Sequence, residues 1–302
     1  MARRAQYAAG VACIFFVAVI WTAATVVKQV IFQNMHFRQP LMVTYMCNSC
    51  YMVHLPLFAL GRGLGLIKAL PWKSPRLEAE DDEVAPTVAE AVRVGAIVAP
   101  FWFAAQWTYN SGIVTTSVTS STVISATSAV WTLLASVLFL GERLTVTKVA
   151  GIAACVAGNV AVTAQGTASP QQWGDVFCIV SAMIYAVYTT VLTRFSNDKT
   201  SVMWLFGSIG VIVFVVCGPF TLWLNWRDWR RMTWKIFGLV VFNGFFDNVL
   251  SQYAWAKAVH WTSPTAATVG LSLTIPLSIL ADGLRGTAVP APSLLAAALV
   301  TL

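Results

Sequence analysis

The sequence predicts an all-α integral membrane protein in which ten transmembrane helices form two inverted five-helix repeats. The first observation is composition: 58% of the 302 residues are hydrophobic and only 10% are charged, whereas about 25% are charged in a typical soluble domain. The second is a series of apolar runs long enough to cross a bilayer, which takes about 20 helical residues. Because backbone polar groups in hydrocarbon must be bonded internally, and these runs are too long for barrel strands, we expect helices.

The third observation is an internal repeat. A shift of 146 residues aligns the run that begins at Ser117 with the run that begins at Ser263, without a gap. These two runs are the fourth and ninth predicted spans, and an odd offset of five spans makes the repeats inverted. The identical pairs are Gln106/Gln252, Ser117/Ser263, Thr119/Thr265, Thr122/Thr268, Val123/Val269, Leu134/Leu280, Ala135/Ala281 and Leu138/Leu284.

The spans divide the chain into a first repeat (1–165), a hinge (166–172) and a second repeat (173–302). The glycine- and proline-rich segment 61–93 is predicted to be a solvated cytoplasmic loop, and Pro276 is expected to kink the ninth span. The final run has ten residues, about half of the length a tenth helix needs, so we expect that helix to be incomplete. The predicted spans are 7–32, 41–60, 94–113, 116–140, 145–165, 173–194, 201–224, 236–258, 264–281 and 293–302.

The basic residues indicate an orientation. With a cytoplasmic N-terminus, twelve of the nineteen Lys and Arg residues lie on the cytoplasmic side, as the positive-inside rule favours. The net charge of +7 is therefore attributed to membrane-flanking loops, and no nucleic acid partner is expected. The Trp- and Arg-rich segment 223–235 is interpreted as an anchor at the membrane interface.

Polar side chains inside the spans mark the predicted binding site. Polar groups are costly against lipid, so they should face the interior of the bundle or water. The span 236–258 is expected to present its polar residues, Ser251 among them, on one side. Aromatic and amide groups together suit a polar organic solute with a flat or sugar-like part. The predicted substrate-binding residues are Trp21, Lys28, Gln106, Tyr109, Asn110, Tyr185, Tyr188, Asn243, Asp247, Asn248 and Gln252.

Several of these side chains allow a second interpretation. Asp247 is either a structural partner of Lys28 or a proton-coupling group, and Lys28 is either a pathway residue or a snorkelling interface residue. The hydroxyls of the fourth and ninth spans serve mainly in packing. Glu142 and Asp282, at predicted helix ends, are interpreted as cap or gate residues.

No enzymatic site is expected. The six cysteines lie in apolar runs, where free Cys usually packs as a small hydrophobe, and Cys47-x-x-Cys50 has no second pair. The three histidines, His36, His54 and His260, are scattered, whereas a zinc site needs clustered ligands. We therefore predict no cofactor, no metal and no catalytic residue.

Six motifs resemble a known group of transporters. GERLTVTKVAGIAACVAGN (141–159) resembles the drug/metabolite transporter superfamily, also called EamA-like. The closer resemblance is to subfamily F of solute carrier family 35. It rests on IWTAATVVKQVIF (20–32), FWFAAQWTY (101–109), TSSTVISATSAVWTL (119–133), AMIYAVYTTVLTR (182–194) and VGLSLTIPLSILAD (269–282).

The resemblance implies a ten-helix secondary carrier of a eukaryotic endomembrane, either vacuolar/lysosomal or Golgi. The predicted function is transport of a polar organic solute, similar to a nucleotide sugar, nucleotide or vitamin, by alternating access. The expected partners are this solute and the lipid bilayer, and a homodimer is compatible with the sequence. The alternative is a transport-inactive membrane receptor or scaffold with the same fold.

Overall fold

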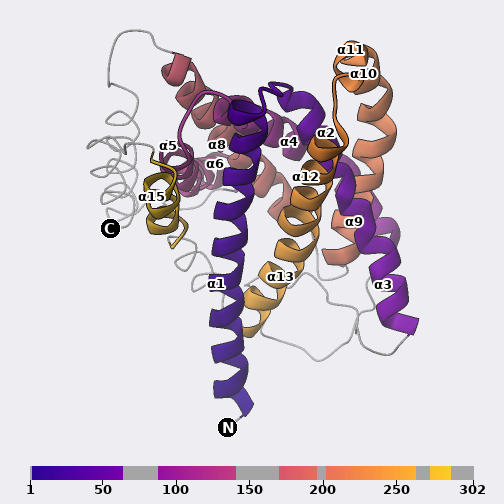
Figure 1. Ribbon diagram of the computed structural model, residues 1–302. Helices are drawn as coiled ribbons and strands as arrows, with labels where there is room; N and C mark the ends of the chain where they lie inside the picture. The colour runs from indigo at the N-terminus through magenta and orange to yellow at the C-terminus, as the bar shows by residue number, and fades with distance from the viewer. Residues whose placement is uncertain (1, 64–87, 141–169, 196–201, 263–272, 287–302) are drawn as a thin grey trace. The chain divides into compact units, whose positions relative to one another are not determined.

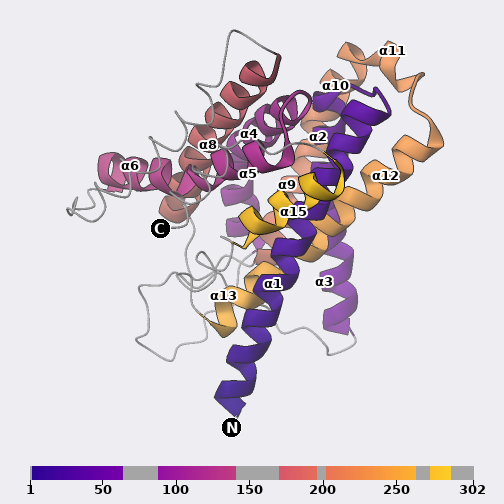
Figure 2. The same cartoon turned by 60° about the vertical axis from the view of Figure 1, so that its left-hand side comes forward.

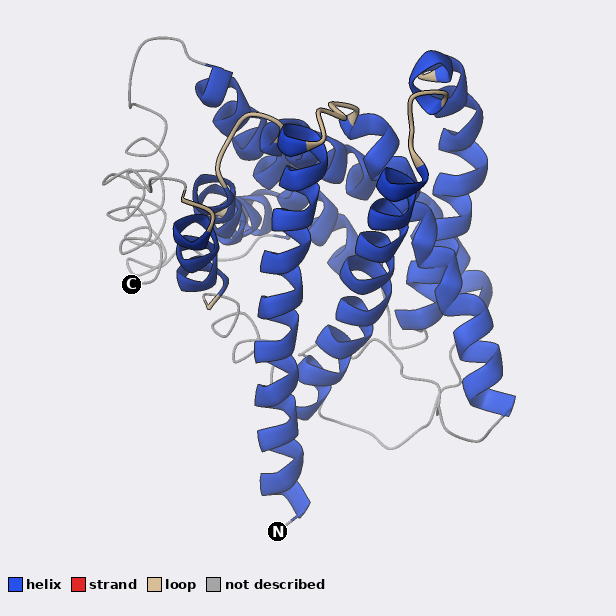
Figure 3. Ribbon diagram, in the orientation of Figure 1, coloured by secondary structure: helices blue, strands red, loops and turns tan. Residues whose placement is uncertain are grey.

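A computed structural model describes residues 2–63, 88–140, 170–195, 202–262 and 273–286, and every regular element in these ranges is helical (Figure 3). Five helical stretches in the described ranges are long and apolar enough to cross a membrane. The prediction of an all-α membrane protein is therefore confirmed for this part of the chain, and the predicted spans at 145–165 and 293–302 lie outside it. The five stretches are Gln6–Asn34, Val88–Ile113, Val118–Phe139, Gln172–Leu192 and Val202–Leu224.

Figure 1 shows the order of the helices, and several predicted spans are divided between two or three of them. The α-helices are α1 (Ala2–Gln29), α2 (Pro40–Ser49), α3 (His54–Gly63), α4 (Val88–Ile113), α5 (Val118–Ala126), α6 (Ser128–Leu140), α8 (Pro170–Phe195), α9 (Val202–Ile212), α10 (Gly218–Leu224), α11 (Trp226–Trp229), α12 (Trp234–Gly244), α13 (Ser251–Trp261) and α15 (Thr274–Leu284). The π-helices η1 (Val30–Asn34), η3 (Val213–Cys217) and η4 (Phe245–Leu250) and the 3₁₀-helix η2 (Cys50–Val53) join them.

The predicted loop and hinge are both too long. Helix α3 continues to Gly63 and α4 begins at Val88, so segment 61–93 is helical at both ends. The start of α4 has good helix formers. Its first turn also contains the acidic Glu90, whose negative charge interacts favourably with the positive end of the helix dipole. Likewise α8 begins at Pro170, inside the predicted hinge 166–172, because proline fits the first helical position.

The kink at Pro276 stays a prediction, because residues 263–272 of the ninth span lie outside the described residues. Helix α15 begins at Thr274, so Pro276 lies in its first turn. Amides of the first turn have no partner within the helix, so proline costs no hydrogen bond there. Helix α6 begins at Ser128 and α15 at Thr274, which are 146 residues apart, the same shift as in the sequence repeat.

The chain forms two compact units, and each draws on both halves of the sequence. Unit 1 contains Met1–Ile20, Tyr45–Pro100 and Val191–Leu271. Unit 2 contains Trp21–Thr44, Phe101–Thr190 and Ser272–Leu302. Helix α4 changes from unit 1 to unit 2 after Pro100, the proline inside that helix.

Glycines bring the helices of unit 1 close together. Helix α9 packs against η2 and α3, as Figures 1 and 2 show. A Cβ atom at Gly210 would lie 2.2 Å from the backbone nitrogen of Met52, and one at Gly244 would lie 3.0 Å from the Cα of Cys47. The Tyr51 and Phe206 rings stack at 5.3 Å between centroids. Unit 1 therefore depends on small residues where helices cross, as membrane proteins often do.

Unit 2 also has glycines where its helices cross. Helices α4 and α8 meet at Gly112 and Gly174, where a Cβ atom on either glycine would lie within 2.7 Å of the other's carbonyl oxygen. Helix α15 packs along α5. Val123 and Ile124 of α5, Ile275 of α15 and Cys178 of α8 form a buried core.

Candidate functional site

One face of α1, which carries Thr25, lies against α4 in unit 2. The Thr25 hydroxyl oxygen is 3.4 Å from the hydroxyl oxygen of Tyr109, and it also donates to the Trp21 carbonyl oxygen at 3.0 Å. Lys28 is 4% exposed and lies within electrostatic range of the Tyr109 hydroxyl. Tyr109 packs against the buried core of the unit. An ammonium and two hydroxyls therefore come together here.

The two tyrosines predicted on α8 belong to an aromatic cluster with Trp102 of α4. The centroids of Tyr188 and Trp102 are 4.8 Å apart, and those of Tyr185 and Tyr188 are 5.4 Å apart. Tyr188 is buried and Tyr185 is only partly buried. Ring packing accounts for the burial of Tyr188, whereas part of the Tyr185 side chain stays accessible. Gln106, one turn along α4 from Trp102, is also partly buried.

Asn110 links two elements of unit 2. Its Nδ2 donates to the Thr44 Oγ1 at 2.8 Å, and the side chain is 1% exposed. Its Oδ1 has no hydrogen-bond partner among the described residues. The Nδ2 of Asn110 therefore links α4 to the start of α2, and its Oδ1 is a buried hydrogen-bond acceptor.

The π-helix η4 rearranges the polar residues predicted on one side of the eighth span, in unit 1. Asn243, Asn248 and Gln252 are buried, whereas Asp247 is partly exposed. A π turn bonds residues five apart rather than four, so Asn248 takes the direction that an α-helix would give to Asp247. The Asn248 Nδ2 donates to the Cys47 carbonyl oxygen of α2.

A further polar group of unit 2 was missed from the sequence. Its centre is the turn between α4 and α5, where the Gln29 Nε2 donates to the Thr116 carbonyl oxygen at 2.6 Å. The Thr116 hydroxyl donates to the carboxylate of Asp175 of α8. Asp175 is 2% exposed. It reaches this turn because α8 begins against α4 at Gly174, and no sequence pattern indicated that crossing.

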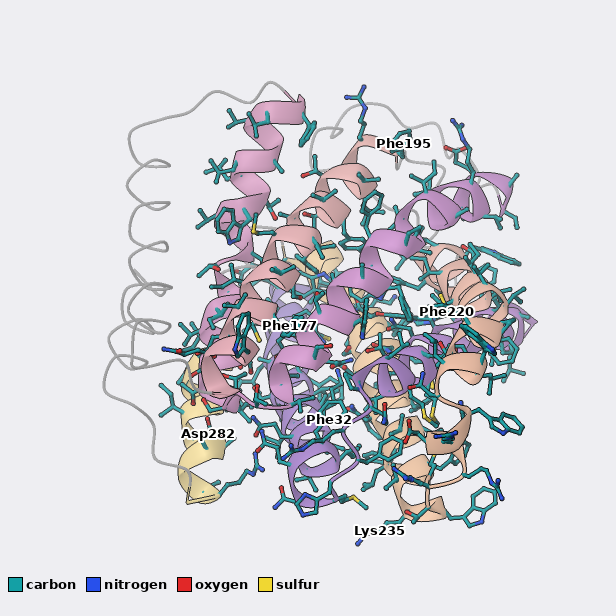
Figure 4. All side chains as sticks on the ribbon, turned by 90° about the horizontal axis from the view of Figure 1, so that it is seen from above. Phe32, Phe177, Phe195, Phe220, Lys235 and Asp282 are labelled. Atoms are coloured by element: carbon teal, nitrogen blue, oxygen red, sulfur yellow. The ribbon has the colours of Figure 1, made fainter. Side chains whose placement is uncertain are left out.

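Helix α15 completes the group, which we name the turn clamp (Gln29, Thr116, Thr119, Asp175, Asp282 and Arg285). Asp282, labelled on α15 in Figure 4, accepts a hydrogen bond from the Thr119 backbone N–H at 2.7 Å. Arg285 donates to the Gln29 Oε1. Asp282 therefore caps α5 from another helix, which fits the cap or gate interpretation. Glu142, the other residue interpreted in this way, lies outside the described residues.

The described cysteines form no disulfide, and the described residues form no cluster of potential metal ligands. Cys13, Cys47, Cys50, Cys178 and Cys217 are free thiols. No group of three or more His, Cys, Asp and Glu side chains that could hold a metal ion occurs among the described residues.

Known proteins similar to this chain are membrane proteins and transporters. Solute carrier family 35 member F5 of Bos taurus is 30% identical over 207 residues, which is 65% of this chain but only 40% of that protein. An uncharacterized vacuolar membrane protein of Saccharomyces cerevisiae is 25% identical over 92% of this chain and 84% of its own length. The thiamine-repressible mitochondrial transport protein THI74 of the same yeast is 24% identical over 90% of this chain and 84% of its own length.

The family comparison agrees with these relatives. The model of the EamA-like transporter family matches residues 8–164 and 172–302. With nearly the whole chain matched, this protein belongs to the EamA-like transporter family and resembles subfamily F of solute carrier family 35.

Proposed function

We propose that this protein is a secondary transporter that moves a polar organic solute, of the nucleotide-sugar, nucleotide or vitamin type, by alternating access. The observation behind the proposal is the group formed by Lys28, Thr25 and Tyr109 inside unit 2 of a family transporter. Buried cations and hydroxyls within a span are costly unless they serve a pathway or a partner.

The residue types of this group favour a particular solute chemistry. The ammonium of Lys28 would pair with an anionic group of the solute, such as a phosphate or a carboxylate. The partly buried rings of Trp21 and Tyr185 would contact a planar group, and the Gln106 amide would bond hydroxyls. A sugar, base or vitamin ring that carries an anionic group combines all three features.

Two observations support inverted repeats as the basis of the transport mechanism. Helices α6 and α15 begin 146 residues apart, at the shift that aligns the sequence repeats. The two compact units each combine segments of both sequence halves, as expected where corresponding helices of inverted repeats assemble side by side. In this arrangement, movement of one helix group against the other exposes the site alternately to each side.

An endomembrane is the proposed location. One yeast relative is named as a vacuolar membrane protein and another as a mitochondrial transport protein. We propose the vacuolar/lysosomal or Golgi membrane for this chain. Fluorescence of the tagged chain beside organelle markers tests this, and a purely plasma-membrane signal would contradict it.

Transport is tested with the purified chain in liposomes. We expect saturable uptake of at least one solute from a panel of nucleotide sugars, nucleotides and vitamins, and acceleration by the same solute on the opposite side. Lys28→Gln should abolish this uptake, while Lys235→Gln, at an exposed position (Figure 4), should not change it. Solute binding without any uptake or exchange would instead favour the receptor or scaffold.

A further inference from the structure

Between the seventh and eighth predicted spans, the chain of unit 1 reverses direction in a short tip. Residues 226–234 contain three tryptophans and three arginines, and we name this segment the arginine–tryptophan tip. Figures 1 and 2 show α11 at the reversal, between α10 and α12. The stretch Val202–Leu224, which is long and apolar enough to cross a membrane, ends just before the tip. A span that ends there puts the tip at the depth of the lipid headgroups.

Local hydrogen bonds hold the backbone of the tip. The Asn225 side chain is 8% exposed and donates through its Nδ2 to the Thr221 carbonyl oxygen at 3.1 Å. The Asn225 carbonyl oxygen accepts the backbone N–H of Asp228 at 2.9 Å. At the other end, the Thr233 hydroxyl accepts the Ile236 N–H at 3.3 Å and caps α12. The side chains of the tip therefore project from an ordered backbone.

The arginines of the tip carry positive charge that its single acid does not balance. Arg231 pairs with Asp228 at 3.7 Å. Arg227 and Arg230 are exposed and have no ion-pair partner among the described residues. Exposed ion pairs contribute little to stability, so folding does not explain three arginines in this segment. Their excess of positive charge instead complements a negatively charged surface.

The tryptophans of the tip are largely uncovered by the rest of the protein. Trp226 is 65% exposed and Trp234 is 87% exposed, and Trp223 of α10, just before the tip, is 76% exposed. The Trp234 ring meets Phe237 edge-on, with 5.8 Å between the centroids, which leaves most of the indole open. Indole rings favour the boundary between acyl chains and headgroups. Rings and guanidinium groups of the tip therefore match the two layers of one lipid surface.

We propose that the arginine–tryptophan tip binds the headgroup of an anionic phospholipid and prefers it to a zwitterionic one. The guanidinium groups of Arg227 and Arg230 donate to the phosphate, which their planar fork fits. The indoles of Trp226 and Trp234 lie against the upper part of the acyl chains. Tryptophan anchors a chain to any bilayer, whereas the excess of positive charge selects the lipid.

This inference does not rest on the proposed transport function. The tip belongs to unit 1, whereas the group around Lys28 belongs to unit 2. Lipid binding at the tip also needs no solute, so it can be measured in a preparation that shows no uptake.

Hydrogen–deuterium exchange of the full chain in nanodiscs tests the proposal at the tip itself. The nanodiscs contain phosphatidylcholine with increasing fractions of phosphatidylserine, and exchange is read on the peptide that covers 226–234. We expect this peptide to exchange more slowly as phosphatidylserine is added. The phosphatidylserine fraction that gives half of this effect should rise about fivefold in Arg227→Gln or in Arg230→Gln, the contribution of one basic residue near an anionic surface.

Two double variants and a control complete the experiment. Arg227→Gln/Arg230→Gln should remove the response to phosphatidylserine, and Arg227→Lys/Arg230→Lys should keep a response because it keeps the charge. Arg194→Gln, which removes an exposed arginine at the end of α8, should behave as the parent. Equal melting temperatures of the parent and the variants check that all of them fold.

Three results would overturn the proposal. The first is exchange at 226–234 that ignores phosphatidylserine in the parent. The second is a response that survives in the double glutamine variant or disappears in the double lysine variant. The third is slow exchange in phosphatidylcholine alone together with a dimer in light scattering, because a second copy of the chain would then cover the tip.

Discussion

Gly112 of α4 and Gly174 of α8 meet backbone to backbone. A Cβ atom at Gly112 would lie 2.6 Å from the Gly174 carbonyl oxygen, and one at Gly174 would lie 2.7 Å from the Gly112 carbonyl oxygen. These distances are far below van der Waals contact, so neither position accepts a larger residue without a shift of a helix. The contact also sets where Asp175, the next residue, reaches the turn between α4 and α5.

The first prediction concerns this crossing. Gly174→Ala should destabilise the protein by about 1–3 kcal/mol, the usual cost of overpacking. Gly238→Ala is the matched control, because a Cβ atom there meets nothing within 4 Å and alanine is the better helix former. Melting temperatures of the two variants in detergent measure the difference. Equal melting temperatures would mean that α4 and α8 do not pack as closely as described.

The second prediction concerns the π-helix of unit 1. Asn248 is 3% exposed and donates to the Cys47 carbonyl oxygen. Asn248→Asp keeps the shape but places a carboxylate against that carbonyl, so we expect a loss of about 2–4 kcal/mol, more than for Asn248→Ala. Denaturation of the purified variants checks the order. If aspartate were tolerated as well as alanine, the amide would not be the link between η4 and α2.

The third prediction concerns the cysteine pair. The Cys47 thiol donates to the Val240 carbonyl oxygen at 3.6 Å and the Cys50 thiol to the Met46 carbonyl oxygen at 3.4 Å. A Cβ atom at Gly244 would lie 2.8 Å from the Cys50 sulfur. Cys50→Ser should therefore change stability by less than about 1.5 kcal/mol, whereas Cys50→Leu should cost about 1–3 kcal/mol through overpacking.

Redox treatment completes the third experiment. Both thiols are free, so dithiothreitol should leave the melting temperature of the parent unchanged. A shift on reduction would indicate that the pair forms a disulfide and would contradict the packing role.

The fold class could be predicted because the bilayer allows few solutions. A chain with 10% charged residues and runs such as Val202–Leu224 has to satisfy its backbone within helices. The interruptions could not be predicted in this way. Hydrophobicity is continuous across Thr127, where α5 ends and α6 begins, and across Val213–Cys217, which is a π-helix.

The site was partly predictable for a similar reason. Trp21, Thr25 and Lys28 stand at helical spacing, so a shared face on α1 can be inferred from the sequence, and the Thr25 hydroxyl of that face lies 3.4 Å from the Tyr109 hydroxyl. Asp175 gives no such signal, because it stands near the start of a span where carboxylates are common. Its role depends on a crossing of glycines that are 62 residues apart, which only tertiary packing reveals.

The last prediction separates binding from packing among the tyrosines. Tyr109→Phe removes the hydroxyl beside Thr25 and Lys28 and should lower uptake efficiency about tenfold, the effect of one lost bond to a charged or polar solute group. Tyr188→Phe keeps the ring that packs 4.8 Å from Trp102 and should stay within about twofold of the parent. Initial uptake rates at several concentrations of the transported solute measure both. If Tyr188→Phe lost as much as Tyr109→Phe, the solute would have to contact the aromatic cluster, and the group around Lys28 would no longer be the preferred site.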